Sequence, residues 1–217
     1  MPKRPTAATQ MRVVKIGGSL LWEELLETRL RKWFDAQQPH HTLLVVGGGA
    51  LADAVRKLDR RYGLSAEAAH EQAIRAMQVN AFALSKLSCD VTWITGLDNW
   101  SKLLRAHKTG EPVQRAALDP VPFLMSDEPQ RAGTRLPCGW QVTSDSIAAR
   151  LAEVVGAVEL VLLKSTLPPG SAECAPIRDA AAASFVDQHF SIAAKRLTNV
   201  RAVNLRDPAF PEVQLTV

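Results

Sequence analysis

The feature that most constrains the fold is a strand-turn-helix pattern that occurs twice near the start of the chain. The run 13–16, rich in β-branched residues, ends in Gly17-Gly18-Ser19 and passes into a segment, 20–36, whose apolar residues have helical spacing. The run 43–46 then ends in Gly47-Gly48-Gly49, and a second helical pattern begins near Ala50. Two successive units of this kind favour a mainly parallel sheet with right-handed crossovers. The pattern therefore predicts an α/β fold.

The rest of the chain continues to alternate between strands and helices. A long helix is expected over 66–88, because its apolar residues share one face and Ser65 can cap its start. Pro168-Pro169-Gly170-Ser171 predicts a loop. Further strands are expected at 91–95, 121–125, 160–163, 201–205 and 212–217, and further helices at 101–107, 144–155 and 185–197.

Length and composition favour a single domain. The chain has 217 residues, of which 47% are hydrophobic, and this is enough apolar material for one sizeable core. We expect residues 1–10 to be a flexible tail and 11–217 to form the domain. The tail lacks the apolar stretch of a signal peptide, and no run of apolar residues is long enough to span a bilayer, so no membrane partner is expected.

Charge and cysteine usage narrow the possible partners. The net charge is +4, and the bases alternate with acids in segments such as 56–61, which predicts a solvated helix face and no nucleic-acid partner. A cationic surface would still attract small anionic metabolites. Cys89, Cys138 and Cys174 are odd in number and widely spaced, so neither a disulfide framework nor a zinc site is indicated. A cytoplasmic location fits this cysteine usage best.

The two glycine turns are candidate anion sites. Lys15 ends a strand and precedes Gly17-Gly18-Ser19, a context in which backbone N–H groups and a helix N-terminus can bind phosphate oxygens. Gly47-Gly48-Gly49 repeats the arrangement, and a parallel sheet would bring both turns to its carboxyl edge. The alternatives are a simple tight turn at the first site and close helix-strand packing at the second.

Further candidates end or begin neighbouring elements. Thr143-Ser144-Asp145 starts a helix, where capping alone could explain the polar residues, whereas Asp145 could also orient a lysine or help hold Mg²⁺. Lys164 ends the apolar strand 160–163 and could stabilise a transferring phosphoryl group, or simply extend to solvent. The histidines are adjacent or lie in separate elements, so we assign no metal ligand.

Four motifs in this order resemble those of the amino-acid kinase family: Lys15-x-Gly17-Gly18-Ser19, Gly47-Gly48-Gly49, Thr143-Ser144-Asp145 and Leu162-Leu163-Lys164. The resemblance extends over nearly the whole chain from Met11. The family includes acetylglutamate, carbamate, aspartate and uridylate kinases. The resemblance implies a three-layer α-β-α sandwich with a mainly parallel sheet, an ATP-dependent phosphotransferase that uses Mg²⁺, and a homo-oligomer.

The resemblance also implies a role for the motifs on the nucleotide side. Lys15 and Gly17-Gly18-Ser19 would bind the ATP phosphates, and Ser165 and Thr166 would lie at the nucleotide turn. Many family members carry T-D-V-x-G at that turn, where this chain continues with Leu167 and two prolines. A late G-M-x-x-K segment, which supplies a catalytic lysine in acetylglutamate kinase, is absent from this sequence.

On the acceptor side, three stretches look most like kinases that phosphorylate the phosphomonoester of aminomethyl-furanmethanol on the route to methanofuran. They are 47–56, 64–70 with 76–77, and 140–148. This resemblance places Gly47, Gly48, Gly49, Thr143 and Ser144 at the acceptor. Arg56 would meet the acceptor's existing phosphate and Asp53 its ammonium group.

The implied mechanism is in-line attack by an acceptor phosphate oxygen on the γ-phosphorus of Mg·ATP. Lys15, Lys164 and the glycine-turn amides would stabilise the developing charge, and Asp145 would organise the lysines. Two alternatives remain. The chain could be a carboxylate or uridylate kinase of the same fold, or a nucleotide- or oxyanion-binding protein without turnover.

Overall fold

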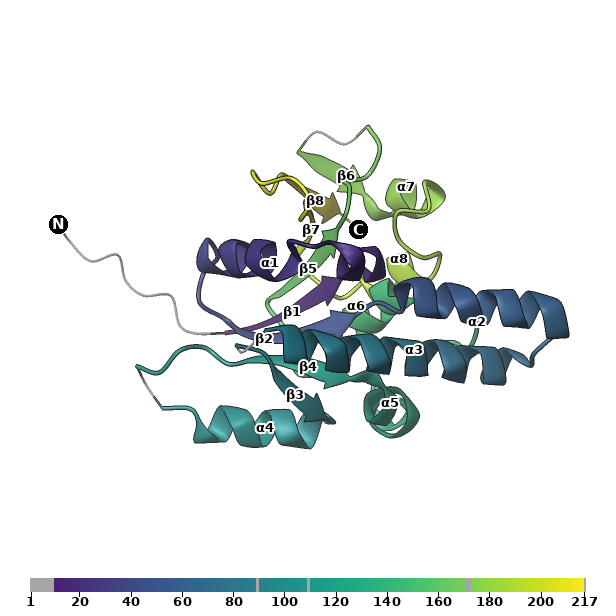
Figure 1. The fold of residues 1–217 in the computed structure, drawn as a ribbon, viewed down its shortest axis with the longest axis horizontal. Helices are drawn as coiled ribbons and strands as arrows, with labels where there is room; N and C mark the ends of the chain where they lie inside the picture. Colours follow the sequence, from purple (N-terminus) through teal and green to yellow (C-terminus); the bar gives the residue numbers. More distant parts are fainter. Residues whose placement is uncertain (1–9, 89, 109, 171–172, 217) are drawn as a thin grey trace.

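The computed structural model describes residues 10–88, 90–108, 110–170 and 173–216, and they contain one eight-stranded sheet (Figure 1). Its strand order is β3-β4-β2-β1-β5-β7-β8-β6, and all the described neighbours are parallel apart from β7 and β8. The predicted mainly parallel sheet is confirmed. The strands are β1 (Met11–Ile16), β2 (His41–Val46), β3 (Thr92–Thr95), β4 (Arg115–Asp119), β5 (Glu159–Lys164), β6 (Cys174–Pro176), β7 (Val200–Asn204) and β8 (Glu212–Thr216).

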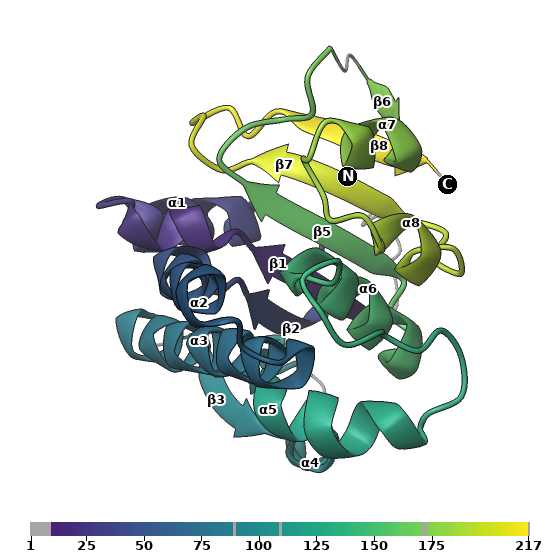
Figure 2. The same cartoon turned by 90° about the vertical axis from the view of Figure 1, so that its right-hand side faces the viewer.

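Helices cover both faces of the sheet, because alternate strand residues point to opposite sides. Val14 lies in one core cluster with Leu30 and Trp33, and Val13 lies in the other with Ile147. Figure 2 shows α1, α2 and α3 on one side and α6 and α8 on the other. The helices and helical turns are η1 (Gly18–Trp22), α1 (Leu26–Asp35), α2 (Gly49–Tyr62), α3 (Ala66–Leu87), α4 (Leu97–Ala106), α5 (Pro120–Pro122), η2 (Phe123–Asp127), η3 (Glu128–Gln130), α6 (Ser144–Val155), α7 (Ile177–Ala182) and α8 (Phe190–Ala193).

Several predicted elements have the expected limits. Helix α3 begins where Ser65 was expected to cap it, and the Ser65 Oγ accepts a hydrogen bond from the Ala68 N–H at 3.2 Å. Helix α6 ends at Gly156, whose φ of 62° allows the left-handed cap. The loop expected at 168–171 is seen over 168–170, while Ser171, Cys89, Val217 and residues 1–9 of the expected tail lie outside the described residues. The single domain at 11–217 stays a prediction.

The strand expected at 121–125 was wrong. The fourth strand is β4 (Arg115–Asp119), and the chain turns helical directly after it. The Asp119 carboxylate accepts a hydrogen bond from the Val121 N–H at 3.0 Å, and Pro120 occupies the first turn. An aspartate cap followed by proline starts a helix more effectively than an apolar run extends a strand.

Three helix limits also differ from those expected. Residues 20–36 form a 3-10 turn, η1, and then α1, so that Leu20 and Leu26 both reach the same core cluster. The expected helix at 185–197 is reduced to the single turn α8, because residues before it bond to α6 and to Lys164. Helix α4 starts four residues before the expected 101. Strand β6 and helix α7 were not predicted.

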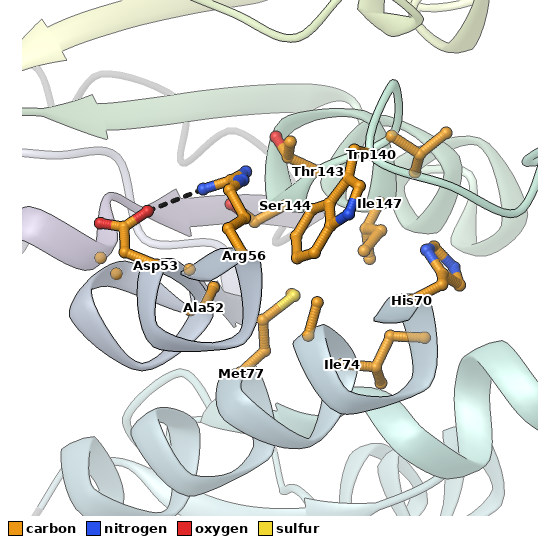
Figure 3. Close-up of a pocket in the computed structure, with 16 residues that line it drawn as sticks. Ala52, Asp53, Arg56, His70, Ile74, Met77, Trp140, Thr143, Ser144 and Ile147 are labelled. Atoms are coloured by element: carbon orange, nitrogen blue, oxygen red, sulfur yellow. Dashed lines mark hydrogen bonds and ion pairs between the residues drawn. The ribbon is translucent and has the colours of Figure 1, made fainter. Parts of the chain in front are cut away.

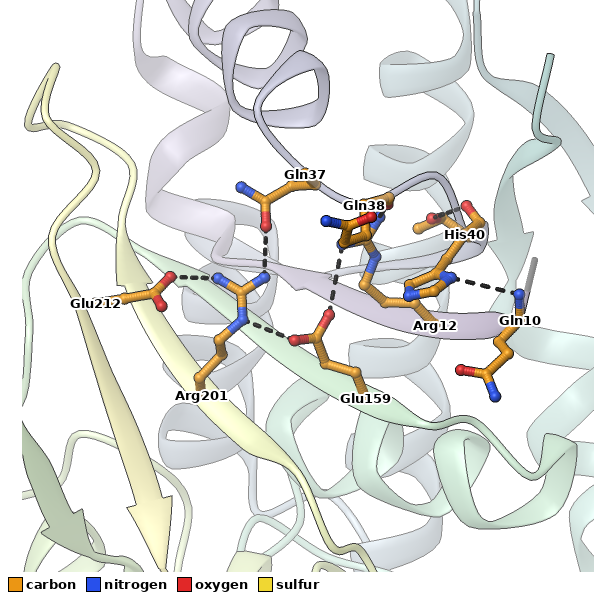
Figure 4. Close-up of polar contacts among 9 residues, drawn as sticks. Gln10, Arg12, Gln37, Gln38, His40, Glu159, Arg201 and Glu212 are labelled. Carbon is orange, nitrogen blue, oxygen red and sulfur yellow. Dashed lines mark hydrogen bonds and ion pairs between the residues drawn. The ribbon is translucent and has the colours of Figure 1, made fainter. Parts of the chain in front are cut away.

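A cluster of partly buried ion pairs lies at the amino ends of β1, β5 and β7. Arg201 of β7 donates to Glu159 of β5 at 2.8 Å and to Glu212 of β8 at 2.5 Å (Figure 4). Arg12 of β1 donates to the same Glu159 at 3.4 Å, and both guanidinium groups lie over the ring of Trp33. These contacts join four strands at the end of the sheet opposite the glycine turns. We therefore assign these ion pairs a structural role.

Candidate active site

Lys15 and Lys164 lie on the same face of adjacent strands. In the β1–β5 register Lys15 is paired with Leu162, and Lys164 follows two residues later. Because strand side chains alternate, both lysines point to the face covered by α6, together with the core residues Val13 and Leu160. Parallel pairing therefore brings two cations to one point at the carboxyl edge.

Asp145, in the first turn of α6, lies between the two lysines. Its Oδ1 is 2.9 Å from the Lys15 Nζ, and its Oδ2 accepts a hydrogen bond from the Lys164 Nζ at 2.8 Å. The Lys15 contact is an ion pair without hydrogen-bond alignment, since Oδ1 has no hydrogen-bond partner within the described residues. Both carboxylate oxygens are thus engaged by lysines. Of the roles considered for Asp145, the geometry fits the lysine-orienting one.

Burial and charge set the protonation of this cluster. Burial, together with the nearby Lys164, lowers the pKa of Lys15 to about 8, although Asp145 opposes the shift. Burial alone would raise the pKa of Asp145, but attraction to Lys15 and Lys164 lowers it to about 2. Asp145 is therefore anionic at neutral pH. With both lysines protonated, the cluster carries one net positive charge, which suits an anionic ligand.

The two glycine turns are packed backbone against backbone. A Cβ on Gly18 would lie 2.3 Å from the Gly49 N, and one on Gly47 would lie 2.8 Å from the Gly18 N. Gly49 also has a φ of 51°. No side chain fits at this contact. Close packing of the two turns against each other, rather than of a helix against a strand, explains these glycines.

Hydrogen bonds fix the turns and limit their free amides. The Gly17 N–H donates to the Leu163 carbonyl at 2.8 Å, and the Gly47 N–H donates to the Ile16 carbonyl at 2.9 Å. Asn80 of α3 donates to the carbonyls of Gly47 and Gly48. Any phosphate bound here would have to use the later amides of each turn.

Two neighbouring cavities adjoin the start of α6, and Asp145 and Lys164 line the larger of them. The glycine-turn cavity, of about 170 Å³, lies between the second glycine turn, α3 and the start of α6 (Figure 3). The Lys164 cavity, of about 920 Å³, is lined by Asp145, Lys164 and the segment 181–188. The residues that line both are Arg56, Trp140 and Thr143. The glycine-turn cavity is also lined by Gly18, Gly47, Gly48, Gly49, Ala52, Asp53, His70, Ala73, Ile74, Met77, Val142, Ser144 and Ile147.

Arg56 and Trp140 form the boundary between the cavities. The Arg56 guanidinium lies 4.6 Å from the centroid of the Trp140 ring, and its Nη1 donates to Asp53 at 2.8 Å. The indole N–H of Trp140 donates to Asp59 at 2.6 Å. Arg56 and Asp53, both from α2, line the smaller cavity, and the acceptor contacts expected of them stay predictions.

The structure does not bring every expected residue to these cavities. Five predicted site residues line neither of the two: Lys15, Gly17, Ser19, Ser165 and Thr166. Ser19 is exposed. The nucleotide-binding roles of the five residues stay a prediction. The Thr143 hydroxyl donates to Asp187 at 2.8 Å, so its proton is already used.

Sequence reasoning missed four residues of this region: His70, Trp140, Phe185 and Asp187. Trp140 stood within the quoted motif around Asp145 and was not assigned a role. His70 lines the glycine-turn cavity, and burial lowers its pKa. Phe185 and Asp187 had no signal in the sequence, because their contacts with Lys164 and α6 join segments far apart in the chain.

Comparison with known proteins places the chain among its relatives. A match to the amino acid kinase family covers residues 10–166. The chain belongs to the amino acid kinase family. It is 25% identical over 152 residues to a (5-(aminomethyl)furan-3-yl)methyl phosphate kinase of Methanocaldococcus jannaschii. That alignment covers 70% of this chain, which spans 64% of the length of the relative.

Solved structures show the same fold. The UMP kinase from Ureaplasma parvum superposes with a TM-score of 0.69 at 14% identity, over 98% of both chains. The uridylate kinase from Archaeoglobus fulgidus superposes with a TM-score of 0.58 at 18% identity, over 96% of this chain and 91% of that one. The three-layer amino-acid-kinase fold expected from the motifs is thereby confirmed.

Proposed function

We propose that this protein is an ATP-dependent kinase that phosphorylates a small phosphomonoester to a diphosphate. The observation that carries the proposal is the Lys15-Asp145-Lys164 cluster, whose Asp145 and Lys164 line the larger of two adjoining cavities. Membership of the amino acid kinase family and the likeness to a phosphate kinase support it. The larger cavity has room for a nucleotide, and the smaller one suits the acceptor.

In this mechanism the chain supplies position and charge. An acceptor phosphate is largely anionic at neutral pH, since its second pKa is about 6, so its oxygen can attack without a general base. Lys15 and Lys164 neutralise charge on the phosphoryl oxygens, and Asp145 keeps both ammonium groups at the carboxyl edge. The reaction needs the acceptor oxygen and the γ-phosphorus in line, which the two adjoining cavities allow.

Mg²⁺ remains part of the proposal, as the usual companion of ATP, but Asp145 does not fit as its ligand. Both Asp145 oxygens are held by lysines, at 2.9 and 2.8 Å. Among the described residues, no group of three or more histidines, cysteines and acids could hold a metal ion. We therefore derive no step through a protein-bound metal.

The glycine-turn cavity favours a small acceptor with an apolar body. Its volume of about 170 Å³ is below the roughly 300–1,000 Å³ of sites for drug-sized ligands. Ile74, Met77 and Ile147 give it apolar walls, and Asp53 and Arg56 lie at its mouth. A furan ring that carries a phosphate and an aminomethyl group, as named for the relative, matches these features. A compound on the route to methanofuran is therefore the acceptor that we propose.

An acceptor panel tests this function. The protein is incubated with Mg·ATP and aminomethyl-furanmethanol phosphate, UMP, N-acetylglutamate or carbamate, and products are separated by mass. We expect a diphosphate from the furan phosphate only. Turnover of UMP or of a carboxylate would instead establish the alternative kinase, and ATP binding without any product would establish the non-catalytic binder.

Assembly and location stay predictions. The predicted homo-oligomer has a physical basis in large apolar side chains that are exposed on α3 and on the segment before α1, among them Trp22, Phe82 and Leu87. Light scattering of the purified protein measures the oligomeric state directly. Within the described ranges, no helix combines the length and apolar character needed to cross a bilayer. The cytoplasmic location is a further part of the proposal.

A further inference from the structure

The start of α6 is capped by a residue from a distant part of the chain. Thr143, at the cap position, makes no side-chain cap of its own. Instead, the Oδ2 of Asp187 accepts hydrogen bonds from the Thr143 N–H at 2.9 Å and the Ser146 N–H at 3.0 Å. A carboxylate here satisfies amides that have no partner within the helix, and it interacts favourably with the helix dipole.

Side-chain hydroxyls and a further amide complete the contacts of Asp187. Its Oδ2 also accepts from the Thr143 hydroxyl at 2.8 Å, and its Oδ1 accepts from the Ser146 hydroxyl at 2.5 Å and the His189 N–H at 3.1 Å. Both oxygens are therefore occupied by neutral donors. Asp187 can neither take a lysine from Asp145 nor offer a vacant oxygen to a ligand.

The residues that Asp187 holds lie on both sides of Asp145 in the chain. Thr143 and Ser146 are two residues before and one residue after it, so their position decides where the Asp145 carboxylate lies. Two residues before Asp187, the Phe185 carbonyl accepts a hydrogen bond from the Lys164 Nζ at 2.6 Å. The ring of Phe185 also lies 4.8 Å from that nitrogen. One short segment thus contacts both the helix that carries Asp145 and one of its lysine partners.

We propose that Asp187 is a positioning residue for phosphoryl transfer. It fixes the first turn of α6 so that Asp145 bridges Lys15 and Lys164. This inference rests on the proposed function of that cluster. The physical reason is that displacement of a catalytic group by about 1 Å can lower the rate roughly a hundredfold.

The test compares Asp187→Asn with a matched control, Asp98→Asn. An asparagine side chain has one acceptor oxygen, and its NH2 group cannot accept hydrogen bonds from the N–H and O–H donors that the carboxylate now satisfies. The substitution therefore weakens the cap while the side chain keeps almost the same size. Asp98 is also in the first turn of a helix, but it is exposed. That helix, α4, lies beside the edge strand β3 (Figure 1). Ser146→Ala removes a single hydroxyl donor, and it serves as a milder variant if Asp187→Asn does not fold.

Three readouts are compared with wild type: steady-state kinetics on ATP and the phosphomonoester, the melting temperature, and the NMR signals of the Lys15 and Lys164 ammonium groups. For Asp187→Asn we expect kcat to fall at least about tenfold, with KM for ATP within about threefold of wild type. We also expect both lysine signals to shift. Asp98→Asn should leave kcat and these signals unchanged.

A lower melting temperature with unchanged kcat and unchanged lysine signals would overturn the inference, since Asp187 would then stabilise the helix and nothing more. The spectra need no turnover. If the wild-type protein phosphorylates no acceptor, the proposed function fails. In that case the lysine signals alone decide whether Asp187 positions the cluster.

Discussion

The Lys15 Nζ lies 2.9 Å from the Asp145 Oδ1, and each side chain is only 6% exposed. This is a buried ion pair at the carboxyl edge of the sheet, shared with a second lysine, Lys164. A buried carboxylate is stabilised by a paired cation, and here two lysines are available to it. When an anionic phosphoryl group arrives, the excess positive charge of the cluster is available to it.

Lys15→Ala is expected to lower kcat at least about tenfold, because the mutation removes transition-state charge stabilisation. Asp145 keeps Lys164 as a partner, so we expect the protein to remain folded. Steady-state kinetics and circular dichroism measure the two effects. Lys32→Ala, which removes an exposed lysine in the last turn of α1, is the matched control. Normal kinetics in folded Lys15→Ala would remove Lys15 from the mechanism.

Lys164→Met keeps most of the side-chain length and removes the charge. We expect kcat to fall roughly a hundredfold, about 2.7 kcal/mol in the barrier, with little change in melting temperature. Lys164 matters here because the sequence lacks the late lysine of acetylglutamate kinase. A kcat within about threefold of wild type would show that Lys164 only pairs with Asp145.

Activity should depend on the protonation of Lys15. Since the pKa of Lys15 in the ligand-free protein is lowered to about 8, we expect kcat/KM to fall as the pH rises through about 8. Asp145 opposes this shift, so Asp145→Asn should move the loss of activity to lower pH and lower kcat as well. A pH profile of kcat/KM for both proteins makes the comparison. If activity were lost at the same pH in Asp145→Asn as in wild type, the proposed effect of Asp145 on the pKa of Lys15 would be contradicted.

The same cluster predicts how stability varies with pH. The pKa of Asp145 falls from 3.8 to about 2 on folding, so its contribution is present above 3.8 and is lost as the pH drops toward 2. The pKa of Lys15 also falls on folding, from 10.5 to about 8, so the dependence has the same sign: stability increases again as the pH rises from about 8 to 10.5. Urea unfolding across these two pH ranges measures how the free energy of unfolding changes with pH in each. Lys15→Ala should abolish the change in the alkaline range.

Gly18→Ala should destabilise the fold more than an ordinary glycine substitution. Its Cβ would lie 2.3 Å from the Gly49 N, which requires the two turns to separate. Gly63→Ala is the control, because Gly63 has a φ of 64° and open space around its Cβ, and it should cost about 1–2 kcal/mol. Thermal unfolding compares the variants. Equal melting temperatures would show that the turns can move apart freely.

Arg56→Gln tests the acceptor side. If Arg56 meets the acceptor's phosphate, KM for a phosphomonoester should rise about tenfold or more, while KM for ATP changes little. Arg60→Gln, an exposed position in the last turn of the same helix, controls for the loss of one charge from α2. Equal KM values in both variants would place the acceptor's phosphate elsewhere.

Much of the fold was determined by local patterns in the sequence. Strands β1 and β2, the turns after them and helix α3 follow from apolar spacing, glycine punctuation and a serine cap, all of which act within a few residues. The strand expected at 121–125 was wrong for an equally local reason, since the Asp119 cap and Pro120 determine a helix there.

The candidate site was only partly determined in this way. Parallel pairing explains why Lys15 and Lys164 could be expected at one edge, because register and alternation follow from the strands themselves. Only the tertiary structure decided that Asp145 would bridge both lysines, that Trp140 would lie against Arg56, and that Asp187 would cap α6. These contacts join segments far apart in the chain, and their geometry depends on how the helices pack on the sheet, which no local spacing encodes.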